Sequence, residues 1–110
     1  MLRLPPERLV YISADGNYSN VHTLDGRTQL VSYQLGQLED LIGEQLGDDG
    51  SHFIRLGRGY IINIEYVYLI DVTLKRLVLS DCATFYEEIE PSREVLVKVK
   101  AYLDATLNDD

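Results

Sequence analysis

The sequence predicts a mainly β domain with one short central helix and a short C-terminal helix. Short runs rich in Val, Ile, Tyr and Thr alternate with turn-forming segments, as expected for a sheet of short strands. Asp25-Gly26 lies between two of these runs and is a strong hairpin signal. Leucine and isoleucine recur at spacings of three and four residues in one central segment, which is typical of an amphipathic helix.

Length and composition indicate one globular domain. A chain of 110 residues can bury a single core, and 45% hydrophobic with 25% charged residues excludes a disordered chain. We expect the domain to span residues 1–110, with its core at about 8–103 and a frayed tail at 104–110. No apolar run approaches the ~20 residues of a membrane-spanning helix, and the first eight residues lack the apolar segment of a signal peptide. We therefore expect a cytoplasmic protein.

The N-terminal elements are predicted as strands. Residues 9–12 form a short apolar run, and the turn formers at 13–17 predict a loop after it. Residues 18–24 and 27–33 predict the two strands of a hairpin, with Asp25-Gly26 as the two positive-φ positions of its turn.

The central helix is predicted within residues 33–47. Ser32 is a plausible N-cap, and the segment 47–51 should end the helix and form a flexible acidic loop. The apolar positions share one face, and the acidic ones should face water. The apolar positions are Leu35, Leu38, Leu41, Ile42 and Leu46, and the acidic ones are Glu39, Asp40 and Glu44.

The second half of the chain predicts further strands at residues 60–62, 66–72 and 76–79, with a turn near 73–75. Residues 81–83 predict another turn, although Cys82 stands where a hairpin favours glycine. From Val95 to Leu103 the apolar spacing fits a helix capped by Ser92, while Val95, Val97 and Val99 also alternate as in a strand. We predict the helix.

The charge is unevenly distributed. Ten basic and 18 acidic residues give a net charge of −8, which taken alone argues against nucleic acid as a partner. Residues 51–80 nevertheless hold four basic side chains against two acidic ones. The middle of an acidic chain is therefore locally basic, at Arg55, Arg58, Lys75 and Arg76.

The sequence lacks the motifs of the common enzyme classes, such as GxSxG, HExxH, the P-loop, CxxC and GxGxxG. His22 and His52 have no second ligand at a metal-binding spacing, and we expect His22 to be a half-exposed structural residue. The acidic segment 87–94 lacks the pattern of a calcium loop and should be a solvated face. Cys82 is the single cysteine, which we expect to be a partly buried spectator. We predict no enzyme, no metal and no cofactor.

Two segments, followed by Ser92-Arg93, carry a resemblance over about residues 8–103. The first, residues 11–26, contains Gly16-Asn17-Tyr18 and Asp25-Gly26, and the second is Phe53-Ile54-Arg55-Leu56-Gly57-Arg58-Gly59-Tyr60-Ile61-Ile62-Asn63. In this order, and separated by a leucine-rich helix, they resemble the LytTR family, the DNA-binding output domain of many bacterial response regulators. The family pattern in the second segment is Phe-x-Arg-x-His-Arg-Ser-Tyr-x-x-Asn. This chain differs at Gly57 and Gly59, which remove two side chains that could donate to DNA and leave backbone N–H groups to approach it.

The resemblance implies an elongated stack of small antiparallel sheets, with loops that enter successive segments of the DNA major groove. It places the base-reading positions near Asn17 and Tyr18, at Arg58 and at Arg93. Arg55 is a weaker candidate, because it lies three residues from Arg58 and could instead pair with a carboxylate. Asn63 is expected to satisfy backbone groups inside the domain.

The leading hypothesis is a sequence-specific domain that binds double-stranded DNA in a bacterial transcription regulator. The resemblance further implies that two copies bind one DNA site as paired direct repeats. The resemblance also implies a receiver or sensor domain in the full-length protein, and the early first strand favours excision of this chain from it. The alternative is a protein-interaction module that keeps the scaffold but has lost DNA affinity, as the net charge and the two glycines suggest. A metal-dependent or redox enzyme would rest on Cys82 and the acidic segments alone.

Overall fold

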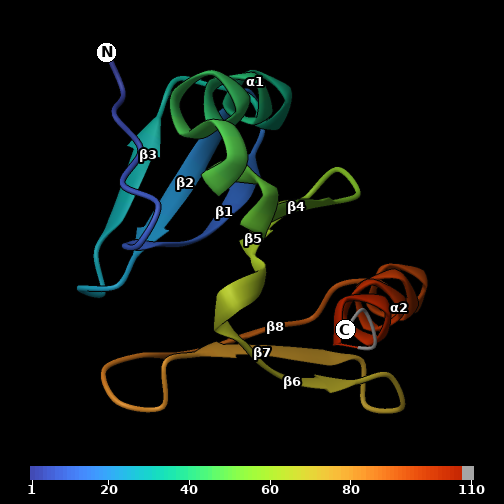
Figure 1. The fold of residues 1–110 in the computed structure, drawn as a ribbon. Coiled ribbons are helices and arrows are strands. Elements are labelled where there is room, and N and C mark those ends of the chain that lie inside the picture. Colours follow the sequence, from blue (N-terminus) through green and yellow to red (C-terminus); the bar gives the residue numbers. More distant parts are fainter. Residues whose placement is uncertain (108–110) are drawn as a thin grey trace. The chain divides into compact units, whose positions relative to one another are not determined.

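The structure is a computed structural model, and it describes residues 1–107 in two compact units, 1–66 and 67–107. Each unit contains one antiparallel sheet and one α-helix, which confirms the prediction of a mainly β chain with a central and a C-terminal helix (Figure 1). The division into one domain over residues 1–110 stays a prediction.

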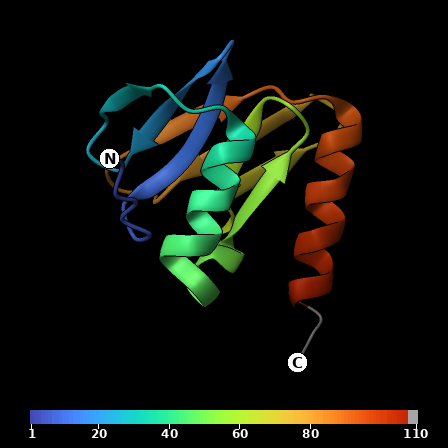
Figure 2. The same cartoon turned by 90° about the horizontal axis from the view of Figure 1, so that it is seen from above.

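The first unit is a five-stranded sheet in the order β3-β2-β1-β5-β4. The helix α1 packs against β1 and β5 (Figure 2), and the core between them includes Leu9, Ile12, Leu38 and Ile61. Its elements are β1 (Leu9–Asp15), β2 (Tyr18–Thr23), β3 (Thr28–Val31), α1 (Leu35–Leu46), the 3-10 helix η1 (Gly47–His52), β4 (Phe53–Leu56), β5 (Tyr60–Asn63) and the 3-10 helix η2 (Ile64–Tyr66).

The helix α1 lies within the predicted range and buries Leu35, Leu38 and Ile42, while the three acidic residues of its outer face are exposed. Its N-cap is Gln34 and not Ser32, because the Gln37 side chain accepts a hydrogen bond from the backbone N–H of Gln34 (2.8 Å). The predicted flexible loop at 47–51 is instead the 3-10 helix η1.

Two predictions about hairpins are corrected by the strand register. The first strand continues to Asp15 and is not followed by a loop from residue 13, because residues 13–15 pair with residues 18–20 of β2. In the β2–β3 turn only Gly26 has a positive φ (80°), and the Thr23 carbonyl accepts from its N–H. Asp25 keeps a negative φ, as in a three-residue hairpin loop whose last residue is glycine.

The second unit is a three-stranded sheet in the order β6-β7-β8, with α2 packed against β6. The elements are β6 (Val67–Asp71), β7 (Arg76–Ser80), β8 (Tyr86–Ile89) and α2 (Arg93–Leu107). The strand β8 was not predicted, since its two central residues are glutamates. Tyr66, predicted to begin a strand, lies in η2.

The C-terminal segment is a helix, which resolves the two interpretations of its valines. The Ser92 hydroxyl accepts a hydrogen bond from the Val95 N–H (3.3 Å), as expected for the predicted cap. Val99 is buried and Val97 is 52% exposed, so the alternation of a strand does not apply. Residues 104–107, predicted to fray, continue α2, while the predicted fraying of 108–110 lies outside the described residues. Within residues 1–107, neither α-helix has the length and apolar character needed to cross a membrane.

Candidate nucleic-acid interface

The β1–β2 turn carries the first pair of candidate residues. Gly16 and Asn17 form a two-residue turn, and Gly16 has the positive φ (63°) that such turns require at their first position. Asn17 is exposed, and Tyr18, the first residue of β2, is 49% exposed. The Asn17 Oδ1 accepts a hydrogen bond from Gln34 Nε2 (3.2 Å), so this turn is tied to the residue that caps α1.

The β4–β5 turn carries Arg58. Leu56, the last residue of β4, pairs with Tyr60, the first residue of β5. Gly57, Arg58 and Gly59 therefore form the turn between the two strands. Gly57 has a φ of 62°, which disfavours any residue with a side chain. Arg58 is exposed, and no other residue of the described chain pairs with its guanidinium. It lies in the turn and not on a strand, so the expectation that Arg55 and Arg58 face opposite ways along a strand does not apply.

Strand register brings these two turns to the same end of the sheet. Ser13 near the end of β1 pairs with Tyr60 at the start of β5, and the Ala14 N–H donates to the Gly59 carbonyl (2.8 Å). Because β1 and β5 are antiparallel, the turn after β1 and the turn before β5 project in the same direction, as Figure 2 shows. We call the group formed by residues 16–18 and 57–59 the loop end.

Arg55 has partners inside the first unit. Its Nη1 lies 2.8 Å from Glu39 Oε1 on α1, and its Nε donates to the Gly57 carbonyl (3.0 Å). Its side chain is 33% exposed. Pairing with a carboxylate, the alternative considered from the sequence, is therefore present in the structure.

Arg93 belongs to the second unit, so it is not grouped with the loop end. It is the exposed first residue of α2, next to the capping Ser92. A cation at a helix N-terminus meets the positive end of the helix dipole and does not stabilise the helix. Helix stability therefore does not explain an arginine at this position.

The remaining polar residues singled out from the sequence have structural roles. His22 is half-buried and stacks on Tyr11, with ring centroids 3.9 Å apart, while its nitrogens lie within hydrogen-bond distance of Ser13 and Thr28. Burial lowers the pKa of the His22 imidazole below its ordinary value. Asn63 is buried and donates to the Leu9 carbonyl (2.9 Å), as predicted.

Cys82 is exposed, which corrects the expectation of a partly buried thiol. Its φ of 63° places it at a turn position that favours glycine. The turn is ordered by the Asp81 carboxylate, which accepts from the backbone N–H groups of Ala83, Thr84 and Phe85 and from the Thr84 hydroxyl. These hydrogen bonds hold the pKa of the Asp81 carboxyl well below its usual range.

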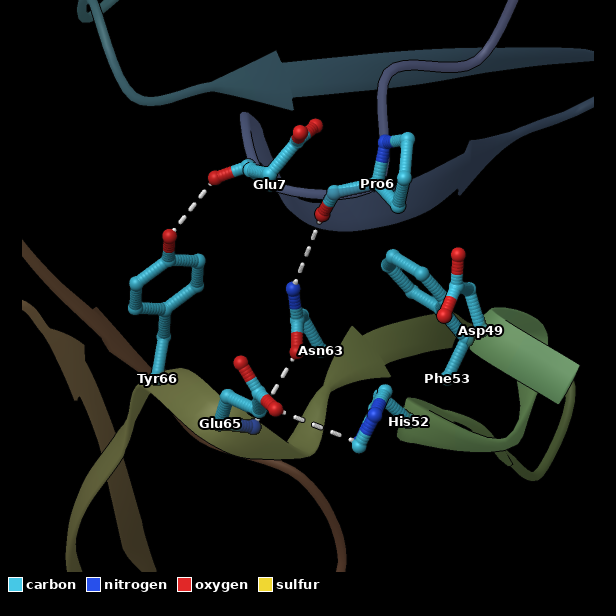
Figure 3. Close-up of a pocket in the computed structure, with 8 residues that line it drawn as sticks. All are labelled: Pro6, Glu7, Asp49, His52, Phe53, Asn63, Glu65 and Tyr66. Carbon is cyan, nitrogen blue, oxygen red and sulfur yellow. Dashed lines mark hydrogen bonds and ion pairs between the residues drawn. The ribbon is translucent and has the colours of Figure 1, made fainter. Parts of the chain in front are cut away.

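A pocket of about 230 Å³ lies in the first unit beside η2 (Figure 3). Several of its polar groups bond to one another or to backbone: Tyr66 Oη donates to the Glu7 carbonyl (2.7 Å), and His52 lies 3.4 Å from Glu65. Among the described residues, no three His, Cys, Asp or Glu side chains are grouped as they would be around a metal ion. The hydrogen bond from Tyr66 to the Glu7 carbonyl ties η2 to the N-terminal segment at this pocket. Its lining residues are Pro6, Glu7, Asp49, His52, Phe53, Asn63, Glu65 and Tyr66.

Sequence reasoning did not identify Gln34 or Glu39 as residues of the interface. Each contacts a candidate residue that is 16 or 17 positions away in the chain, Asn17 for Gln34 and Arg55 for Glu39. No local spacing links such positions. The only available signal was the possibility that Arg55 pairs with an unspecified carboxylate.

Comparison with known proteins gives a family and a related structure. The family model of the LytTr DNA-binding domain matches residues 1–104, which confirms the resemblance inferred from the sequence. A solved structure of the LytTr DNA-binding domain of a protein described as a methyl-accepting/DNA response regulator, from Bacillus cereus, matches with a TM-score of 0.66. The two chains are 21% identical, and the match covers 93% of this chain and 86% of the other. No curated protein matches the sequence.

Proposed function

This chain belongs to the LytTr DNA-binding domain family, and we propose that it binds double-stranded DNA sequence-specifically as the output domain of a bacterial transcription regulator. The family is one of DNA-binding domains and not of enzymes. The proposed role requires no chemistry, metal or cofactor, only contacts to base edges and phosphates.

The observation that carries the proposal is the loop end. Strand register groups Asn17, Tyr18 and Arg58 at one end of the sheet, and all three are exposed. The guanidinium of Arg58 has the planar fork that matches the O6 and N7 acceptors of guanine, or a phosphate. The Asn17 amide can pair with adenine, since its Oδ1 can accept a second hydrogen bond beside that of Gln34. The Tyr18 hydroxyl can contact the DNA backbone.

Arg93 is the second principal contact in this proposal. It is exposed at the start of α2, where helix stability does not favour a cation. The proposal therefore assigns one arginine contact to each unit. Arg55 contributes less directly, because two of its nitrogens already have partners in the protein.

The acidic composition fits specific binding better than general affinity for DNA. With a net charge of −8, the long-range field of the chain repels phosphates, so non-specific binding should be weak. Affinity must then come from a few well-placed cations and from contacts to bases.

We extend the proposal to the setting in which the domain acts. Two copies bind paired direct repeats, the full-length protein contains a receiver or sensor domain of a two-component system, and the protein acts in the cytoplasm. The match to the family model supports DNA as the partner. The related structure, which comes from a protein described as a response regulator, supports the receiver domain.

Selection of bound sequences from a random library of duplexes tests the proposal. The chain should enrich one motif, and enriched molecules should carry it twice in the same orientation. Binding should be measured at two salt concentrations, because the electrostatic part of the affinity depends on salt. Failure to enrich any motif at either concentration would contradict the proposed function.

The alternative, a protein-interaction module on the same scaffold, is supported by the net charge and by Gly57 and Gly59 in the β4–β5 turn. Within the described chain, no heavy atom other than those of Gly59 and its two chain neighbours lies within 4 Å of the Cβ position that a side chain at Gly59 would occupy. The turn therefore has room for a side chain but presents only backbone there. The same selection separates the two functions, since an interaction module would enrich no sequence.

A further inference from the structure

The guanidinium of Arg55 joins α1 to the turn that carries Arg58. Its Nη1 donates to Glu39 Oε1 (2.8 Å), and its Nε donates to the carbonyl of Gly57 (3.0 Å). Because the guanidinium is planar and rigid, two bonds from one group fix the Gly57 carbonyl relative to the helix. Gly57 immediately precedes Arg58, so this contact constrains the base of the turn.

The same helix also contacts the other turn. Gln34, the N-cap of α1, donates from Nε2 to Asn17 Oδ1 (3.2 Å). This hydrogen bond links the β1–β2 turn to the residue that caps α1. The helix is anchored in turn by Leu35 and Leu38, which are buried against the sheet. Both turns of the loop end are therefore bonded to a single rigid element.

We infer that Glu39, acting through Arg55, is a positioning residue that holds the Arg58 turn in its DNA-binding geometry. This inference rests on the proposed function. Glu39 itself does not contact DNA, and the main role of Arg55 is to hold the turn and not to read bases. The hydrogen bond from Gln34 to Asn17 gives the β1–β2 turn the same support.

The inference predicts an effect opposite in sign to simple electrostatics. Glu39 is a negative charge on an acidic domain, so its removal should strengthen attraction to phosphates. Loss of positioning should instead weaken binding to the specific site, because Arg58 must then be ordered on binding. Asp40 is the matched control, since it is an adjacent exposed acid on α1 that pairs with no other residue of the described chain.

The experiment compares Glu39→Ala and Asp40→Ala on the selected duplex and on a scrambled duplex, at two salt concentrations. Glu39→Ala should weaken binding to the selected duplex by about three- to tenfold and should bind the scrambled duplex at least as well as the unmodified chain. Asp40→Ala should bind both duplexes at least as tightly as the unmodified chain. The inference is overturned if the two variants bind the selected duplex equally well.

A second readout uses the free protein and needs no DNA. The NMR signals of the Gly57, Arg58 and Gly59 amides should shift in Glu39→Ala and stay in place in Asp40→Ala, with both variants keeping the dispersed spectrum of the folded chain. Unshifted turn amides in Glu39→Ala would overturn the positioning role. If the unmodified chain enriches no duplex, the proposed function fails, and these amide signals still decide whether Glu39 holds the turn.

Discussion

Cys82 shows what a single backbone angle can decide. Its φ of 63° is in the left-handed region, which costs a residue with a Cβ about 1–2 kcal/mol. The sequence already indicated a turn in which glycine would be favoured at this position, and only the burial of the thiol was predicted wrongly. A Cβ at the outside of a two-strand turn points to solvent, which explains the exposure.

Cys82→Gly should therefore raise the free energy of unfolding by about 0.5–1 kcal/mol, after the entropy cost of glycine is subtracted. Cys82→Ser is the control, because it removes the thiol and keeps the backbone strain. Urea denaturation of both variants measures the difference. Cys82→Ser should also keep DNA binding within about threefold, since the thiol has no role in the proposed interface. A gain in stability in Cys82→Ser equal to that in Cys82→Gly would refute the strain argument.

His22 should make stability depend on pH. Burial lowers the pKa of its imidazole in the folded state, while the unfolded chain has the ordinary value of about 6.5. As the pH falls through 6.5, the unfolded state binds a proton before the folded state does, so the free energy of unfolding decreases. At pH 7 and above this contribution is fully present.

The measurement is the free energy of unfolding between pH 7.5 and pH 5 for the unmodified chain and for His22→Gln, which keeps hydrogen-bonding groups but does not titrate. The unmodified chain should lose more stability over this interval than His22→Gln. Identical pH profiles would show that the imidazole titrates equally in the folded and unfolded states.

The pairing of Arg55 with Glu39 marks the limit of residue-level prediction. From the sequence, Arg55 was a weaker DNA candidate that could instead pair with a carboxylate, and that carboxylate could not be named because it lies 16 positions away. Tertiary structure decides which carboxylate is near. In contrast, the role of Asn63 was predictable, because a buried amide near a strand end commonly satisfies backbone groups.

At the scale of elements, periodicity was a reliable guide where one face is buried. The stripe on α1 identified the helix and its three buried residues. The strand β8 was missed because Glu87 and Glu88 disfavour a strand by propensity. Only Ile89 of this strand is buried. In the structure β8 is an edge strand whose Glu88 pairs with Arg76 of β7 (2.6 Å), so pairing with β7 overrides the propensity.

The core role of α1 gives a stability prediction. Leu38 is fully buried and Ile42 is 5% exposed, so Leu38→Ala and Ile42→Ala should each lower the free energy of unfolding by about 2–5 kcal/mol. Glu44→Ala, an exposed change on the same helix, should stay within about 0.5 kcal/mol of the unmodified chain. Urea denaturation checks all three variants. A Leu38→Ala variant as stable as Glu44→Ala would mean that α1 does not cover the core.

At the scale of the whole molecule, family membership could be inferred from ordered motifs that no single element specifies. The motifs from Gly16-Asn17-Tyr18 to Ser92-Arg93 extend over both units, as does the family match over residues 1–104. The grouping of two turns at one end of a sheet could not be read from the sequence, because it depends on the pairing of β1 with β5, whose residues are about 50 positions apart.

The acidic composition predicts how affinity should respond to salt. Binding to the selected duplex should fall steeply as salt rises, while binding to scrambled duplexes should be weak throughout.

Arg93→Ala tests the contact proposed for the second unit, with Lys98→Ala and Lys100→Ala of α2 as controls. If Arg93 contacts phosphate alone, its removal should weaken binding evenly across sequences and reduce the salt slope by about one. If the lysine changes weaken binding more than the arginine change, the proposed contact on α2 is wrong.

The most direct test of the central claim is the binding of Arg58→Ala to the selected duplex and to each of its single-base variants. Arg58 has no partner elsewhere in the described chain, so its removal should leave the fold intact. If Arg58 reads a guanine, the variant should lose about 1–3 kcal/mol of binding free energy on the selected duplex and should lose its preference at one base position. Full affinity together with an unchanged preference at every position would contradict the assignment of the loop end as the surface that reads DNA.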